Sequence, residues 1–206
     1  PLCGPFFLPD SLTLRRGSGT CKVKLILLTI NTGGKLTRED SANGDKQRMK
    51  AYDISGLSIL VLEKQVLIRR LLTDVFTAFG VPTVHSTGDL ATAWQIFNDN
   101  PIDIILCDWC EDLNGMEFLH YVRNDEESPN PFVCFFMVTA YTEISKVCLA
   151  RDQGMTEYLA KPVSARMVYM RIVRVIEDAR SFVRAPEFFG PDRRRRKHGE
   201  VPLRER

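Results

Sequence analysis

The sequence lacks any apolar run long enough to cross a membrane as a helix, since such a span needs about 18 or more consecutive apolar residues. The longest apolar stretch near the amino terminus, Leu25–Leu28 with its apolar neighbours, is far shorter. The Thr-Gly-Gly-Lys sequence at 32–35 offers no small-residue cleavage site of the kind that ends a secretory signal. We therefore expect a cytoplasmic protein without a membrane segment.

Cysteine and histidine are also scarce, with six and three residues. The cysteines are scattered through apolar segments rather than arranged as a disulfide framework, which is typical of a reducing compartment. Cys107 and Cys110 form one C-x-x-C, but no second pair accompanies it, so a redox or zinc site is the weaker interpretation. His85, His120 and His198 share no ligand spacing, and we interpret them as structural or surface residues.

Charge is unevenly distributed, although the net charge of the 206 residues is only +2. Residues 1–50 carry nine basic and four acidic side chains, residues 51–181 carry 11 and 18, and residues 182–206 carry eight and four. An acidic body therefore lies between two basic ends. A chain of this length predicts one domain of ordinary size with appendages.

Composition predicts where the domain begins and ends. Residues 1–52 show no sustained period, so we expect a disordered extension with at most one strand; Met49 is a candidate translation start that mapping would test. Residues 53–181 form the expected domain. Residues 182–206, which include the basic run at 193–197, are too short for an output domain and are expected to be a largely disordered basic tail. The aromatic part of this tail could instead fold back on the acidic body or dock a partner, and the basic run would bind nucleic acid only nonspecifically.

Within the expected domain, short apolar runs alternate with amphipathic segments. The expected strands are Ser58–Leu62, Thr83–His85, Ile102–Cys107, Phe132–Val138 and Glu157–Leu159. The expected helices are Gln65–Phe79, Leu90–Asn98, Met116–Asn124, Ile144–Gln153 and Ala165–Arg180. Ser164 is the expected cap of the last helix, and Gly80 and Gly154 should end the first and fourth. Five successive βα units predict a doubly wound α/β fold, a parallel sheet with helices on both faces.

Polar side chains follow the expected strands at their carboxyl ends. Asp108 ends the run of Ile and Leu at 102–107, which suits a strand buried on both faces. Glu63, Thr139 and Lys161 follow the first, fourth and fifth strands. In a sheet of order 2-1-3-4-5 these strand ends are adjacent, so the four side chains should converge on one crevice. Two acids, a hydroxyl and an ammonium suit the binding or transfer of a phosphoryl group.

This arrangement resembles the receiver domain of two-component response regulators over about residues 56–180. The matching positions are Asp108, Asn114-Gly115, Thr139-Ala140, Tyr158 and Lys161-Pro162. The resemblance implies a flavodoxin-like (βα)5 fold in which Asp108 accepts a phosphoryl group from the phosphohistidine of a histidine kinase or phosphotransfer protein. Thr139 would hydrogen-bond the phosphoryl oxygens, and Lys161 would pair with their charge.

The resemblance also implies how such a signal would spread. Once Thr139 moves inward, Tyr158 would turn from an exposed to a buried rotamer and change the surface of the fourth helix, fifth strand and fifth helix, where a downstream protein would bind. The Lys161-Pro162 bond resembles the cis peptide of the family, which would aim the ammonium at the site.

The sequence departs from the family at the metal site. Two adjacent acids after the first strand bind Mg²⁺ in the family together with the phosphoacceptor, and here those positions are Glu63 and Lys64. The remaining candidate ligands are Glu63, Asp108 and, more weakly, the backbone carbonyl of Cys110. The ammonium of Lys64 could lie beside the vacant metal position as a cation substitute, which would slow phosphotransfer, or it could point into solvent.

The loop after Asp108 departs from the family as well. It is one residue shorter to the glycine than the usual pattern, and it has Asp112 where the family commonly has proline. Glu111 and Asp112 could compensate for a missing metal ligand, but a solvated acidic loop is the favoured interpretation.

Two functions follow, with a third as the weakest. The first is a stand-alone receiver that is phosphorylated on Asp108 and signals through protein contacts, without specific nucleic-acid binding and without enzyme activity beyond slow hydrolysis of its own aspartyl phosphate. The second is a degenerate receiver that binds partners without phosphorylation. The third is a phosphatase of the haloacid dehalogenase type, which would need Asp-x-Asp after the strand, whereas this chain has Cys110 in the second acidic position.

Overall fold

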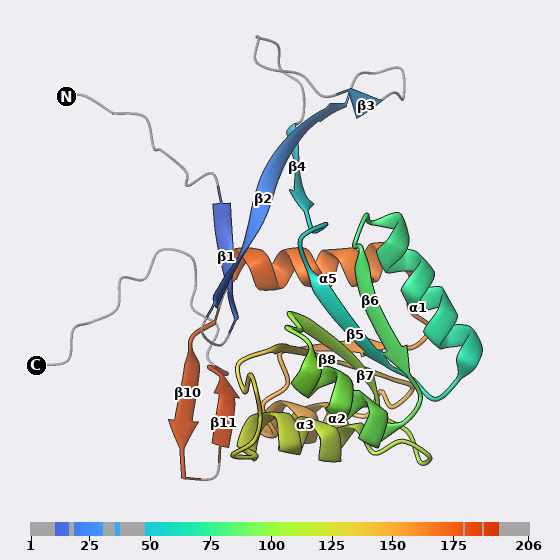
Figure 1. Ribbon diagram of the computed structural model, residues 1–206, viewed down its shortest axis with the longest axis vertical. Coiled ribbons are helices and arrows are strands. Elements are labelled where there is room, and N and C mark those ends of the chain that lie inside the picture. Colours follow the sequence, from blue (N-terminus) through green and yellow to red (C-terminus); the bar gives the residue numbers. More distant parts are fainter. Residues whose placement is uncertain are drawn as a thin grey trace, which may run out of the picture.

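A five-stranded parallel sheet forms the centre of the protein in the computed structural model (Figure 1). The structure describes residues 11–16, 19–30, 36–37, 48–178, 180–186 and 188–193. The sheet strands are β5 (Ser58–Leu62), β6 (Thr83–Thr87), β7 (Ile104–Asp108), β8 (Cys134–Thr139) and β9 (Glu157–Ala160). Their order in the sheet is β6-β5-β7-β8-β9, which confirms the predicted order 2-1-3-4-5.

Five helices cover both faces of this sheet. They are α1 (Val66–Ala78), α2 (Leu90–Asp99), α3 (Gly115–Asn124), α4 (Ile144–Asp152) and α5 (Ala165–Glu177). In β5, Ile59 and Val61 pack in the core beneath α1 and α5, while Leu60 and Leu62 pack in the core beneath α2 and α3. Successive strand residues point to opposite faces, so a strand between two helical layers is apolar at nearly every position, as predicted.

Local sequence signals set the helix ends. Gly80 and Gly154 adopt positive φ values of 79° and 91° just after α1 and α4, as predicted, because glycine tolerates this conformation without steric cost. Ser164 caps α5 by accepting a hydrogen bond from the amide of Met167 at 3.3 Å, which is also confirmed. The peptide bond between Lys161 and Pro162 is cis.

The strand predicted at Ile102–Cys107 begins two residues later and ends one residue later, as β7 (Ile104–Asp108). Asp103 lies outside the strand, where its amide donates to the carbonyl of Ser58 and its carboxylate accepts from the Ser58 amide at 2.8 Å. Asp103 is 5% exposed and joins the starts of β5 and β7.

Four strands lie in the amino-terminal stretch, where we expected disorder with at most one strand. They are β1 (Ser11–Arg16), β2 (Gly19–Ile30), β3 (Leu36–Thr37) and β4 (Arg48–Asp53), and β2 pairs antiparallel with each of the others. The other positions of 1–47 lie outside the described residues. Tyr52 already belongs to the domain core, with its hydroxyl donating to Glu177 of α5 at 2.9 Å.

A short antiparallel hairpin follows α5, formed by β10 (Phe182–Ala185) and β11 (Phe188–Pro191). The expectation of a largely disordered tail, made for residues 182–206, is wrong for the described hairpin, and the alternative that the aromatic part folds back on the body is the one seen. The physical reason is aromatic packing: Phe132, just before β8, lies 5.3 Å from the rings of both Phe182 and Phe189. Residues 194–206, with most of the basic run, lie outside the described part of the chain. Among the described residues, no helix has the length and apolar character of a membrane span.

Candidate functional site

The carboxyl edge of the sheet brings three of the predicted side chains into direct contact. The ammonium nitrogen of Lys161 lies 2.6 Å from Oε2 of Glu63 and 2.9 Å from Oδ1 of Asp108. Both carboxylates are almost fully buried, with 1% and 2% of their residue surfaces exposed. One cation therefore bridges two buried acids that lie 45 residues apart in the sequence, at the ends of β5 and β7.

Glu63 is held by the turn that joins β5 to α1. Its amide donates to the carbonyl of Thr87 at 3.0 Å, and its Oε1 accepts from the amide of Gln65 at 3.0 Å. The guanidinium of Arg69 donates to the Glu63 carbonyl at 2.6 Å. Gly88 leaves room for this guanidinium, because a Cβ atom at that position would lie only 2.7 Å from Arg69 Nη1. The acid is thus positioned by bonds to its backbone and its side chain.

Asp108 is held where α3 begins. A Cβ atom at Gly115 would lie 2.2 Å from the carbonyl oxygen of Asp108, so only glycine permits α3 to start this close to β7. Asn114 caps the helix, its side chain accepting from the amide of Glu117 at 3.4 Å. The predicted Asn-Gly pair therefore has a structural role in placing the loop beside Asp108.

The group of Glu63, Asp108 and Lys161 carries one negative charge in excess when all three are ionised. Burial raises the pKa of the Glu63 carboxyl above its usual value, and the favourable contacts from Lys161 and Gln65 offset this only in part. Burial by itself would lower the pKa of Lys161, but its hydrogen bonds to both acids outweigh burial and raise that pKa. Both shifts favour the protonated forms, as expected for a buried group with surplus negative charge.

Lys64 is not part of this group. Its side chain is exposed, and within the described residues no ion pair joins it to Glu63 or Asp108. Its charge instead adds a small effect on Asp89, whose pKa is lowered mainly by hydrogen bonds from Thr92. The cation beside the two acids is Lys161, so the contacts give the proposed substitution by Lys64 no support.

The residues present do not fit a divalent ion as they are arranged. One oxygen of Glu63 and one oxygen of Asp108 already contact Lys161, and Lys64 occupies the position of the family's second acid. The carbonyl of Cys110 accepts from the amide of Leu113 at 3.3 Å. Mg²⁺ needs several oxygen ligands in near-octahedral geometry, and the described residues hold no cluster of three or more acids, histidines or cysteines suited to a metal.

Thr139 lies at the end of β8 beside the acids, but its hydroxyl is engaged elsewhere. It donates to the carbonyl of Trp109 at 2.6 Å and accepts from the amide of Tyr141 at 3.1 Å. The hydroxyl of Tyr158 donates to the carbonyl of Tyr141 at 2.5 Å, and partial burial raises the pKa of the Tyr158 phenol. The backbone of Tyr141 thus connects the predicted site hydroxyl to the predicted switch tyrosine.

A cation and two aromatic rings, none of them predicted from the sequence, belong to or contact the two residues whose backbone binds Thr139. The ring of Trp109 lies 5.2 Å from that of Tyr141, and the ammonium of Lys146 lies 5.1 Å and 5.0 Å from the two rings. Spacing from Asp108 and Thr139 was the available signal, since Trp109 and Tyr141 follow them by one and two residues. Glu111 and Asp112 are exposed.

The surroundings of both cysteines in the C-x-x-C sequence disfavour the thiolate form. Cys107 is buried in the core, and burial raises the pKa of its thiol well above the usual value. Burial and a hydrogen bond to Asp108 also raise the pKa of Cys110. Both cysteines are free.

Comparison with known proteins assigns the family. The model of the response regulator receiver domain matches residues 59–173, more than half of the chain. The chain belongs to the response regulator receiver family. Its receiver domain is similar to the chemotaxis protein CheY of Pseudomonas aeruginosa, with 25% identity over 122 residues that cover 59% of this chain and 97% of the relative.

Other relatives agree with this assignment. The polar-differentiation response regulator DivK of Brucella ovis is 25% identical over 127 residues, covering 61% of this chain and 95% of the relative. The solved structure of Vibrio cholerae chemotaxis protein CheY4 superimposes with a TM-score of 0.53 at 22% identity, covering 58% of this chain and 98% of that one. The receiver thus has the flavodoxin-like fold of bacterial two-component response regulators.

Proposed function

We propose that this protein is a response regulator whose receiver is phosphorylated on Asp108 by a histidine kinase or phosphotransfer protein. The observation that carries the proposal is the convergence of Asp108, Glu63 and Lys161 at one sheet edge, with the Lys161 ammonium 2.6 Å from Glu63 and 2.9 Å from Asp108. Membership of the receiver family supports the same role.

In the proposed reaction, an oxygen of Asp108 attacks the phosphorus of a phosphohistidine. An oxygen–phosphorus bond forms as the phosphorus–nitrogen bond breaks, and the electron pair stays on the imidazole nitrogen of the donor. Lys161 then pairs with the new phosphoryl oxygens, because a charged donor on a charged acceptor is the strongest hydrogen bond available there. For Thr139 to donate to the same oxygens, its hydroxyl has to leave the carbonyl of Trp109.

That rotation would change the switch. Thr139 Oγ1 now accepts from the Tyr141 amide, and the Tyr141 carbonyl accepts from Tyr158. If Thr139 turns toward the phosphoryl group, the loop at Tyr141 loses a contact, and Tyr158 is free to change rotamer. The signal would then reach α4, β9 and α5.

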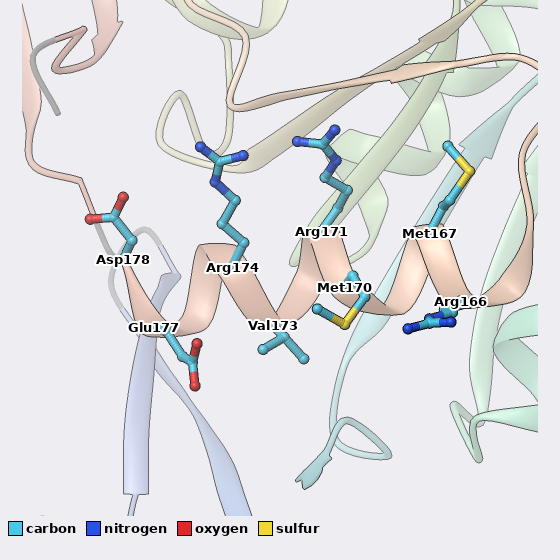
Figure 2. A pocket seen from close by; sticks show the side chains of 8 residues that line it. All are labelled: Arg166, Met167, Met170, Arg171, Val173, Arg174, Glu177 and Asp178. Carbon is cyan, nitrogen blue, oxygen red and sulfur yellow. The ribbon is translucent and has the colours of Figure 1, made fainter. Parts of the chain in front are cut away.

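Two surfaces suit the partners of such a switch. On α1, next to the site, Val66, Leu67 and Leu71 are 64%, 83% and 49% exposed, and we propose this apolar face for the phosphodonor. Along α5 the structure has a groove of about 800 Å³ (Figure 2). Its lining combines Met167 and Met170 with arginines. We propose that a downstream protein binds here, on α4 and on β9, without specific nucleic-acid binding.

Intact mass spectrometry after incubation with acetyl phosphate and Mg²⁺ tests the phosphoacceptor. A phosphate adduct is expected on the wild type, absent in Asp108→Asn, and retained in Asp112→Asn, an exposed acid of the same loop. Loss of the adduct in both variants, or its survival in Asp108→Asn, contradicts the assignment of Asp108.

A second candidate is a degenerate receiver that binds its partners without phosphorylation. Lys64 in the second acidic position favours it, as does the bridging of both remaining acids by Lys161. No adduct across a wide range of Mg²⁺ concentrations would favour this candidate, whereas an adduct that also forms with a chelator present would favour phosphorylation independent of the metal. In either case we propose a signalling protein rather than an enzyme. We also propose that it is cytoplasmic, because the cysteines whose side chains the structure describes are free thiols, as is usual in a reducing compartment.

A further inference from the structure

The hairpin β10–β11 packs against the body through a cluster of three aromatic rings, two from the hairpin and one, Phe132, from the segment before β8. Phe132, Phe182 and Phe189 lie within 5.3 to 5.6 Å of each other, and Phe189 is 8% exposed. At the base of the hairpin the amide of Asp192 donates to the carbonyl of Ser181 at 2.8 Å. Rings at these distances attract each other beyond the apolar area that they bury, so the hairpin is a packed part of the receiver.

The hairpin also makes direct contact with the turn that follows α4. A Cβ atom at Gly190 would lie 2.5 Å from the Cα atom of Gly154, and a Cβ atom at Gly154 would lie 2.3 Å from the carbonyl oxygen of Phe189. The guanidinium of Arg193 lies 3.1 Å from the carboxylate of Asp152, the last residue of α4. Two glycines therefore permit, and an ion pair reinforces, a contact between the hairpin and the end of α4.

A buried arginine also binds this turn. Arg123 of α3 is 1% exposed, and its guanidinium donates to the carbonyls of Gly154, Pro131 and Val133 at 2.7 to 2.9 Å. The guanidinium also lies 5.2 Å from the ring of Phe182. Burial lowers the pKa of Arg123 to about 9, which still leaves it charged at neutral pH. Arg123 thus joins α3, the turn after α4 and the hairpin.

Helix α4 buries few side chains in the core. Ala150 is its one buried residue, whereas α3 has five and α5 has four. At its amino-terminal end, Lys146 contacts the rings of Trp109 and Tyr141 beside the site. A helix with few buried contacts opens at low free-energy cost, so the contacts at its two ends decide how freely it moves.

We propose that the hairpin β10–β11 is an intramolecular clamp on the carboxyl-terminal end of α4, and that it restrains the movement of this helix. The clamp stands on contacts outside the phosphorylation site. Its coupling to Asp108 rests on the proposed function: if α4 moves when Asp108 carries a phosphoryl group, release of the hairpin and phosphorylation must favour each other to the same degree.

Hydrogen–deuterium exchange on the full chain tests the clamp. Gly190→Ala should displace the hairpin, because its Cβ atom would collide with Gly154. Phe189→Ala, which removes a hairpin ring that packs on Phe132, is the second variant in case the first does not fold. Gly56→Ala is the matched control, since nothing lies within 4 Å of a Cβ atom there. Amides of α4 are expected to exchange about tenfold faster in the hairpin variants, with β5 and β7 unchanged.

Unchanged exchange in α4, together with fast exchange in the hairpin, would overturn the clamp. Equal acceleration in α4 and in the central strands would also overturn it, because that pattern reports global destabilisation. The coupling is measured by repeating the exchange on protein that carries the phosphate adduct, where hairpin amides should exchange faster than in the Asp108→Asn variant treated in the same way. If the wild type takes no adduct, the proposed function fails while the exchange of the untreated variants still decides the clamp.

Discussion

Replacing Lys161 with methionine removes the ammonium from the site while keeping a long apolar side chain. Glu63 and Asp108, which are 1% and 2% exposed, would then face each other without their shared cation. Removing one partner of a buried ion pair costs about 3–5 kcal/mol, because the other charge stays buried and uncompensated. The Lys161 side chain is only 13% exposed, so solvent screening reduces this little, and we expect a loss of about 3 kcal/mol in the free energy of unfolding.

Urea unfolding at neutral pH measures this loss. Adding Asp108→Asn to the Lys161 variant removes one of the two stranded charges, so the double variant should be more stable than Lys161→Met alone. Lys146→Met is the control: its ammonium lies over two rings near the site but makes no buried ion pair in the described structure, and its loss should cost about 1 kcal/mol or less.

Two results would refute the electrostatic argument. The first is a cost for Lys161→Met no larger than that for Lys146→Met. The second is a cost that stays constant as the pH is lowered. Because burial raises the pKa of Glu63 above its usual value of 4.5, this acid takes up a proton on acidification, and the penalty for the missing ammonium should shrink.

Three further predictions concern single groups. The pKa of Lys161 is raised in the folded state, so its contribution to the free energy of unfolding is complete below the ordinary value of 10.5 and is lost as the pH rises through the folded-state pKa. Unfolding measured at alkaline pH should show this loss of stability in the wild type and not in Lys161→Met. Gly115→Ala should lower the free energy of unfolding by about 1–3 kcal/mol, because its Cβ atom would lie 2.2 Å from a carbonyl oxygen. Gly56→Ala should lower it far less, and thermal unfolding of both variants measures the difference. Burial and the hydrogen bond to Glu177 raise the pKa of Tyr52 to about 12. In an ultraviolet titration of the tyrosines, Tyr52→Phe should therefore lose a component that the wild type shows near this pH. An unchanged titration would contradict the burial of this hydroxyl.

Most of the central fold was predictable because its signals are local. The run of Ile and Leu before Asp108 predicts a strand buried on both faces, and β7 has that burial at every position. Gly80, Gly154 and Ser164 mark helix ends through backbone preferences that act within one turn. Strand limits were less accurate where a side chain such as Asp103 binds the backbone of a neighbouring strand, since no local pattern reports that bond.

The residues that form the candidate site could be predicted from the sequence, but their contacts could be predicted only in part. Strand order places Glu63, Asp108 and Lys161 at one edge, and the structure brings them together. Whether the Lys64 side chain points into solvent or toward the acids could not be predicted, because the same sequence is compatible with both rotamers. The ring contact between Trp109 and Tyr141 depends on the path of two loops.

The sequence by itself determined where the strands occur along the chain, that the central ones are buried, and which side chains follow them. Apolar periodicity and turn residues act over short distances along the chain, so they can be recognised without the fold. Only the tertiary structure decided which ammonium bridges the two acids, that Arg123 is buried, and that the tail folds back as a hairpin. Each of these depends on the approach of segments separated by tens of residues, where a difference of one rotamer or one loop path changes which charges and rings meet.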